Sequence, residues 1–203
     1  MKIGIDLGGS HIAIGVVDKD GKILDKREKK LRGIANRLIK KTIEETIIDN
    51  VKEYQNNYKI TEIGIAIPGT VNQNKIIKSV NLGLKDYNIV DAINKEINLP
   101  IKIRNDAKCA ALAENKYGAL KKYNRILFMT LGTGIGGAVI KDRHVHHGNA
   151  LHGGEFGYMI MRYDQDEKKY YTWSDDGSTV AVTKRVAKEL GVDYHTLDGK
   201  EVF

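Results

Sequence analysis

Four glycines within six residues, in the stretch Leu131–Gly137, constrain this chain more than any other feature of its sequence. The stretch has the sequence LGTGIGG and follows the apolar run Arg125–Thr130. Glycine leaves the backbone bare and free to adopt positive φ, so its N–H groups can line a concavity that holds an anion, most often phosphate. The stretch therefore predicts a phosphate-binding loop, and a purely structural glycine-rich hairpin is the alternative.

Two other families of proteins use similar glycine patterns. The pattern Gly132-x-Gly134-x-x-Gly137 fits the fingerprint of dinucleotide-binding proteins. The same pattern extended to Val139 fits the glycine-rich loop of protein kinases. A dinucleotide site needs a helix directly after the glycines, whereas Ala138–Val145 alternates and turns as a hairpin does. Neither His-Arg-Asp nor Asp-Phe-Gly occurs in the chain, which excludes a protein kinase.

The composition is that of an ordinary globular domain. The chain has 203 residues, of which 41% are hydrophobic and 29% charged, and it contains no apolar run of the ~20 residues that span a bilayer. A single cysteine, Cys109, excludes an intramolecular disulfide and a zinc site built from cysteines. With no recognisable signal peptide, we expect a cytoplasmic protein without a membrane segment.

The net charge of +7 raises the question of nucleic-acid binding. Lysines and arginines are dense from Lys19 to Lys41, but acidic residues are interspersed among them and no aromatic residues alternate with them. We therefore expect a solvated basic face that can attract a nucleotide or a sugar phosphate, and no nucleic-acid partner. A nucleic-acid binder remains an alternative that rests on charge alone.

The order of apolar patterns predicts a mixed α/β sheet. Strands are expected at Lys2–Gly8, Ile12–Val17, Lys22–Asp25, Glu62–Ile67 and Ile101–Arg104, a hairpin at Val71–Ile77, and helices at Ile34–Tyr54, Asn88–Ile97, Ala107–Glu114 and Ser178–Leu190. The strand and hairpin around Leu131–Gly137 begin a similar pattern again, which predicts two lobes, residues 1–118 and 119–203.

Five segments in order resemble the ROK sugar kinases, members of the actin-like, Hsp70-like ATPase superfamily. They lie at residues 3–18 (IGIDLGGSHIAIGVVD), 63–71 (IGIAIPGTV), 105–114 (NDAKCAALAE), 131–140 (LGTGIGGAVI) and 153–158 (GGEFGY). The resemblance implies an actin-like (ribonuclease H-like) α/β fold with two lobes. It also implies ATP-dependent phosphorylation of a sugar hydroxyl, on a hexose, an amino sugar or a β-glucoside, most simply at O6.

The chemistry of phosphoryl transfer needs charge neutralisation and in-line placement, which two opposed phosphate loops and a carboxylate can supply. The resemblance makes Asp106 the general base for the attacking hydroxyl, with Asn105 on a neighbouring hydroxyl. Asp6 would bind Mg²⁺ mainly through water, because Mg²⁺ keeps several of its waters. The alternatives are a turn-forming aspartate for Asp6 and a helix cap for Asp106.

The remaining site residues fall into two sets. The backbone residues expected to hold the ATP phosphates are Gly8, Gly9, Ser10, Gly132, Thr133 and Gly134. The residues that resemble the sugar side of the family's site are Gly69, Thr70, Asn81, Asn105, Asp106, Glu155 and Tyr158. A solvated loop glutamate is the alternative for Glu155, and a packing role is the alternative for Tyr158.

The chain departs from the family pattern at the zinc site that many members carry. Tyr158 stands at the position of a zinc-binding histidine, and no cysteine follows it, so we expect no zinc. Trp173–Val182 takes the place of the cysteine cluster and of a further sugar-binding glutamate. This resembles the zinc-free branch, which includes β-glucoside and N-acetylmannosamine kinases. The four histidines His144, His146, His147 and His152 are expected to be solvated loop residues.

Family members usually continue well past the helix that ends here near Leu190, with a section that holds the adenosine. The second lobe is therefore expected to be incomplete. This leaves a second function class open, a non-catalytic sugar-binding or regulatory protein on the same scaffold. The resemblance also implies a homodimer.

Overall fold

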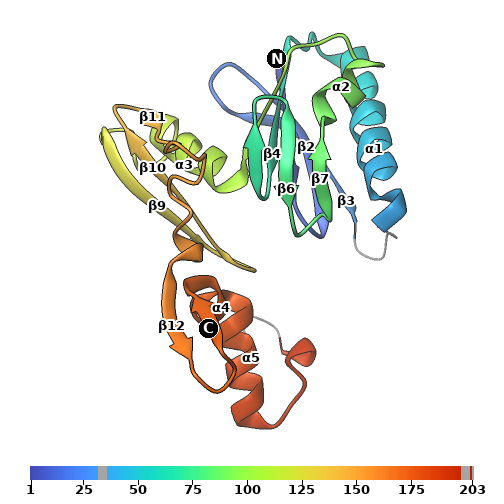
Figure 1. Ribbon diagram of the computed structural model, residues 1–203. Coiled ribbons are helices and arrows are strands. Elements are labelled where there is room, and N and C mark those ends of the chain that lie inside the picture. Colours follow the sequence, from blue (N-terminus) through green and yellow to red (C-terminus); the bar gives the residue numbers. More distant parts are fainter. Residues whose placement is uncertain (32–35, 198–201, 203) are drawn as a thin grey trace. The chain divides into compact units, whose positions relative to one another are not determined.

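The computed structural model describes residues 1–31, 36–197 and 202 (Figure 1). The chain divides into two compact units, Met1–Ala110 and Ala111–Phe203. The division lies within helix α3 (Asp106–Lys116). The boundary after Gly118 expected from the sequence stays a prediction.

The first unit is built on a five-stranded mixed sheet. Its strand order is β3 (Ile23–Lys30), β2 (His11–Val17), β1 (Lys2–Leu7), β4 (Glu62–Ile67) and β8 (Ile101–Asn105). The β1–β2 and β2–β3 pairs are antiparallel, whereas β4 pairs in parallel with both β1 and β8. The mixed α/β architecture predicted from the sequence is confirmed.

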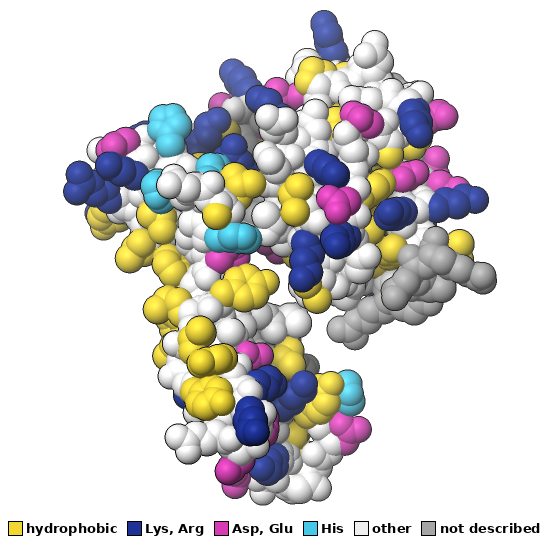
Figure 2. Space-filling model, viewed as in Figure 1, with side chains coloured by type: hydrophobic (Ala, Val, Ile, Leu, Met, Phe, Trp, Pro, Cys, Tyr) yellow, Lys and Arg dark blue, Asp and Glu magenta, His cyan; other side chains and the backbone are white. Residues whose placement is uncertain are grey.

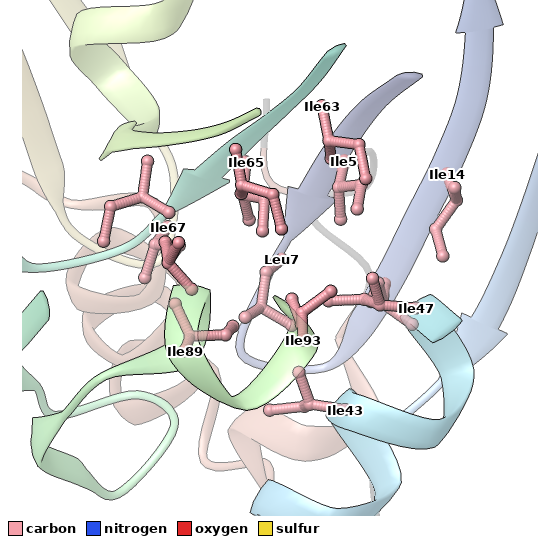
Figure 3. Close-up of a cluster of buried hydrophobic side chains, with 14 of the residues drawn as sticks. Ile5, Leu7, Ile14, Ile43, Ile47, Ile63, Ile65, Ile67, Ile89 and Ile93 are labelled. Atoms are coloured by element: carbon pink, nitrogen blue, oxygen red, sulfur yellow. The ribbon is translucent and has the colours of Figure 1, made fainter. Parts of the chain in front are cut away.

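Two helices cover one face of this sheet. Helix α1 (Asn36–Asn57) and helix α2 (Ile89–Asn94) lie on the same side in Figure 1. Every second residue of β1 is buried, and these alternate side chains pack with apolar residues that recur at helical spacing in α1. Figure 3 shows the resulting cluster, in which Ile5 and Leu7 of the sheet face Ile43, Ile47 and Ile93 of the helices.

A small three-stranded antiparallel sheet completes the first unit. It consists of β5 (Thr70–Asn72), β6 (Lys75–Ser79) and β7 (Leu84–Tyr87). The hairpin expected at Val71–Ile77 is therefore present, as β5 and β6. Helix α2 is shorter than the range predicted from Asn88 to Ile97, because Asn88 caps it and it ends at Asn94. The predicted start of α1 at Ile34 lies outside the described residues.

The second unit contains two small antiparallel sheets and two helices. Strands β9 (Arg125–Leu131), β10 (Ile135–Lys141) and β11 (His144–Val145) form the first sheet, whose core is Ile126, Ala138 and Ile140. The hairpin expected after the glycines is thus confirmed. The short helix η1 (Phe156–Tyr158) follows.

A hairpin of β12 (Ile160–Asp164) and β13 (Lys169–Thr172) occupies a segment for which the sequence analysis predicted neither a strand nor a helix. Its side chains are mostly exposed, so no buried alternation signals it. Helices α4 (Trp173–Gly177) and α5 (Thr179–Leu190) come next, followed by η2 (Tyr194–Thr196). Helix α5 agrees with its prediction, with Ser178 as its N-cap and Gly191 as its left-handed C-cap.

Charges of both signs are interspersed over the first unit (Figure 2). Exposed ion pairs join Lys26 to Glu28 at 2.6 Å and Lys52 to Glu96 at 2.7 Å. This arrangement agrees with the solvated basic face expected from the sequence. None of the helices in residues 1–31, 36–197 and 202 has the length and hydropathy needed to cross a membrane.

Replacement of Ile47 by Ala tests the core between α1 and the sheet. Ile47 is fully buried, so its truncation should lower the free energy of unfolding by about 3 kcal/mol, through lost burial and a residual cavity. Leu38 lies in the same helix and is 47% exposed, so Leu38→Ala is the matched control and should change it by less than about 1 kcal/mol. Urea unfolding measures both variants, and equal losses would contradict the described packing of α1.

Candidate functional site

Asp6 lies near the carboxyl end of β1, on the sheet face opposite to α1. Its neighbours on the flanking strands are Ala13 of β2 and Ala66 of β4. Because both neighbours are small, the carboxylate of Asp6 stays exposed. A single open carboxylate suits a Mg²⁺ ion that keeps most of its water ligands.

The first glycine loop joins β1 to β2. The N–H of Gly8 donates to the carbonyl oxygen of His11 at 2.9 Å, and the N–H of Leu31 donates to the carbonyl oxygen of Ser10 at 2.8 Å. Within the described residues, the N–H groups of Gly9 and Ser10 have no hydrogen-bond acceptor. Of the three predicted phosphate-binding residues, Gly8 therefore closes the turn, and Gly9 and Ser10 keep free donors.

Asn105 ends β8 and is only 6% exposed. Its side-chain Nδ2 donates to the carbonyl oxygen of Gly69 at 3.1 Å, and its Oδ1 accepts the N–H of Lys108 at 3.1 Å. Asn105 thus caps the start of α3 and connects it to the segment after β4.

Asp106 is the first residue of α3 and is half-buried. Burial raises the pKa of its carboxyl group above the ordinary value. The N–H of Ala107, which donates to Oδ1 at 2.8 Å, opposes this rise, and the negative charge of Asp6 adds to it. The electrostatic influence of Asp6 shows that the two predicted carboxylates lie near each other in the first unit. A carboxylate whose pKa is raised by burial and by a like charge is typical of a functional site.

Gly69 adopts a φ of 114°, in the region that favours glycine. A Cβ atom at this position would lie 2.3 Å from the carbonyl oxygen of Lys78, so no larger residue fits. This close approach of β6 fixes the carbonyl group of Gly69, which accepts the hydrogen bond from Nδ2 of Asn105. Thr70 follows directly and begins β5.

Asn81 lies beside the first glycine loop. Its Cβ is 3.0 Å from the position that a Cβ atom of Gly9 would occupy. Of the predicted sugar residues in the first unit, Asn81 is thus beside the predicted phosphate loop, and Asn105 is bonded to Gly69.

The second glycine loop, between β9 and β10, has a similar pattern of hydrogen bonds. The N–H of Gly132 donates to the carbonyl oxygen of Gly134 at 3.0 Å, and the N–H of Ile135 donates to Oγ of Ser174 at 3.0 Å. Within the part of the chain that the structure describes, Thr133 and Gly134 have N–H groups without an acceptor. Gly132 therefore shapes the loop, and Thr133 and Gly134 keep free donors.

Glu155 directly precedes η1 in the second unit, and Tyr158 is the last residue of η1. Glu155 is half-buried, and Tyr158 is 70% exposed. Gly157 between them is buried, and a Cβ atom there would lie 2.1 Å from the carbonyl oxygen of Ile135. The turn that carries both predicted sugar residues is therefore packed directly on the second glycine loop.

Ser174 and Thr179 contact the second glycine loop and were missed as individual site residues in the sequence. The Oγ1 atom and the N–H of Thr179 both donate to the carbonyl oxygen of Gly132, at 2.6 Å and 3.0 Å. The only signal was their place in Trp173–Val182, the segment expected from the resemblance to replace the cysteine cluster and a further sugar-binding glutamate.

Cys109 lies one turn after Asp106 in α3. Burial raises the pKa of its thiol to about 11; Arg104 opposes this rise, and Asp106 and Asp6 add to it. The thiol is therefore protonated near neutral pH and unreactive as a nucleophile.

The histidines show no arrangement typical of a metal centre. Among residues 1–31, 36–197 and 202, no group of three or more His, Cys, Asp or Glu side chains could hold a metal ion. His144 and His146 are exposed, in agreement with their expected place in a solvated loop.

The ROK family model matches residues 2–176 of the chain. An uncharacterized protein of Clostridium perfringens is 33% identical over 203 residues, which covers 98% of this chain and 65% of that protein. A xylose repressor of Bacillus spizizenii is 30% identical over 168 residues, which covers 80% of this chain and 43% of the repressor. A β-glucoside kinase of Listeria monocytogenes is 28% identical over 209 residues, which covers 100% of this chain and 68% of the kinase. The chain thus spans about two thirds or less of the length of these relatives.

Solved structures agree with this relationship. A Listeria monocytogenes protein proposed to be an N-acetylmannosamine kinase superposes with a TM-score of 0.82 at 27% identity, over 98% of this chain and 68% of that protein. The actin-like α/β fold expected from the resemblance is thereby confirmed. Because the family model matches residues 2–176, which is most of this chain, the chain belongs to the ROK family.

Proposed function

We propose that this protein transfers the γ-phosphoryl group of ATP to a sugar hydroxyl, most simply O6 of a hexose, an amino sugar or a β-glucoside. The observation that carries the proposal is the half-buried carboxylate of Asp106, whose pKa is raised by burial and by the nearby open carboxylate of Asp6. The same unit carries the free N–H groups of Gly9 and Ser10. Kinases of β-glucosides and other sugars among the relatives support this class of substrate.

Asp106 is the general base in this proposal. The carboxylate accepts the proton of the attacking sugar hydroxyl as the bond to phosphorus forms. Its raised pKa brings its basicity closer to the working pH than that of an exposed aspartate. Asn105 supports it, since both of its own side-chain contacts hold the start of α3 in place.

Each unit supplies one phosphate loop. The free donors are the N–H groups of Gly9 and Ser10 in the first loop, and of Thr133 and Gly134 in the second. Backbone N–H groups of this kind stabilise phosphate oxygens without a moving charge. Asp6 holds Mg²⁺ mainly through water, and the ion, when bound, neutralises negative charge on the phosphate oxygens.

The sugar contacts come from Asn81, Asn105, Glu155 and Tyr158, with Gly69 and Thr70 beside Asn105. Gly69 acts through its carbonyl group, which fixes the amide of Asn105. The exposed ring of Tyr158 can lie against a sugar or a glycoside substituent. We further propose a cytoplasmic homodimer without a nucleic-acid partner.

The second candidate is a sugar-binding regulator that transfers no phosphate. The similarity to a xylose repressor over 80% of this chain favours it. Calorimetry with sugar and with ATP separately distinguishes the two functions. A regulator binds sugar without any dependence on ATP, whereas a kinase binds both ligands.

Asp106→Asn tests the base directly. The amide cannot accept the hydroxyl proton, so sugar-dependent release of ADP should fall about 10²-fold or more, while sugar binding stays measurable by calorimetry. Asp49→Asn, at an exposed position of α1, is the matched control and should keep the wild-type rate. An unchanged rate in Asp106→Asn would contradict the role of Asp106. Absence of ADP release across a panel of hexoses, amino sugars and β-glucosides would contradict the kinase itself.

The same substitution should stabilise the fold at neutral pH. Because the folded-state pKa of Asp106 is raised, the unfolded chain ionises first as the pH rises, and the wild type loses stability between the ordinary aspartate pKa and the raised folded one. Above that window the loss stays constant. The Asp106→Asn variant does not lose this stability, and its side chain can still accept the N–H of Ala107. In urea unfolding, its free energy of unfolding should therefore exceed that of the wild type by the full amount at pH 7, and the difference should shrink as the pH falls towards 4. A variant less stable than the wild type at pH 7, by an amount independent of pH, would be evidence against this electrostatic description.

A further inference from the structure

We propose that Thr179 and Ser174 are positioning residues that hold the second glycine loop in the shape that binds phosphate. The inference rests on the proposed function and extends it to two side chains in α4 and α5. Both residues lie in the second unit, as does the loop itself. Neither side chain needs to touch the nucleotide for this role.

Thr179 fixes the peptide group of Gly132 from one side. The carbonyl oxygen of Gly132 accepts two hydrogen bonds from Thr179, at 2.6 Å from Oγ1 and at 3.0 Å from N–H. The N–H of Gly132 donates to Gly134 across the loop. Because the N–H and the carbonyl group of Gly132 are both hydrogen-bonded, the free N–H groups of Thr133 and Gly134 have a defined direction.

Ser174 fixes the other end of the loop. Its Oγ accepts the N–H of Ile135, a residue that is only 6% exposed. Loss of this acceptor would leave a buried N–H unsatisfied, which is costly. Ser174 itself lies in α4, which begins with a capping box formed by Thr172 and Asp175.

One N–H group in the first turn of α5 is bonded to the second glycine loop and another to the N-cap side chain. The N–H of Thr179 donates to Gly132, and the N–H of Ala181 donates to Oγ of Ser178. The first turn of a helix normally offers such donors to an anion. Here one of them fixes a loop carbonyl, so the helix supports phosphate binding through the loop.

Ser174 also touches the turn that carries Glu155 and Tyr158. A Cβ atom at Gly157 would lie 2.3 Å from Oγ of Ser174, so the serine fills the space between this turn and Ile135. The phosphate loop and the sugar-side turn of the second unit therefore pack as one body. A shift of Ser174 would disturb both.

Thr179→Val and Thr179→Ser separate the hydrogen bond from the packing. Valine keeps the shape but removes the Oγ1 donor, so the amide exchange of Gly132 and Ile135, followed by NMR without nucleotide, should accelerate about three- to tenfold. The affinity for a non-hydrolysable ATP analogue with Mg²⁺, measured by calorimetry, should fall by a similar factor. Thr179→Ser should retain wild-type exchange and affinity.

Ser178→Ala is the matched control. It removes the N-cap of the same helix and should lower the melting temperature without changing the exchange of Gly132 or the nucleotide affinity, because Ser178 bonds Ala181 and not the loop. Wild-type exchange and affinity in Thr179→Val would overturn the inference, as would an equal loss in Ser178→Ala. If the wild type binds no nucleotide, the proposed function falls, and the exchange of Gly132 and Ile135 still decides the positioning role.

Discussion

The side chain of Asn105 makes the interaction on which the candidate site of the first unit depends. Its Nδ2 donates to the carbonyl oxygen of Gly69, which follows β4, and its Oδ1 accepts the N–H of Lys108 in the first turn of α3. Asn105 is buried, so loss of either contact would leave a polar group without water to replace it. The direction of α3, and with it the place of Asp106, follows from this bridge between two parallel strands.

The position of Asp106 lowers the stability of the folded protein at neutral pH. The helix start that Asn105 fixes also buries the carboxylate of Asp106 and brings it near Asp6, and both effects disfavour its ionised form. The backbone N–H groups of Ala107 and of Asp106 itself oppose these effects, with a smaller combined influence on the pKa. A group whose sole task were to cap α3 would be more stable in an exposed position, which favours a chemical role over the helix-cap alternative.

Much of the fold could be predicted from the sequence, because its signals are periodic. Buried isoleucines at helical spacing predicted α1, and alternation predicted β1 and β4. The β12–β13 hairpin could not be predicted, since its side chains are mostly exposed on both faces. For the site, glycine content located both loops but could not tell Gly8 and Gly132, whose N–H groups close turns, from the neighbours whose N–H groups stay free. The roles of Ser174 and Thr179 depend on contacts 39 and 47 residues away in the sequence, which no local pattern shows.

The two glycine loops share a physical design despite their different sequences. In each, the N–H of the first glycine is used within the loop and the next two N–H groups stay free. In each, a later residue donates to a loop carbonyl: Leu31 to Ser10 in the first, and Thr179 to Gly132 in the second. Glycine gives the chain the freedom to form such a concavity, but freedom alone would make binding entropically costly. The donors from outside each loop remove that freedom before a ligand arrives, so a flexible composition yields a preorganised set of N–H donors, as the proposed phosphate-binding role requires.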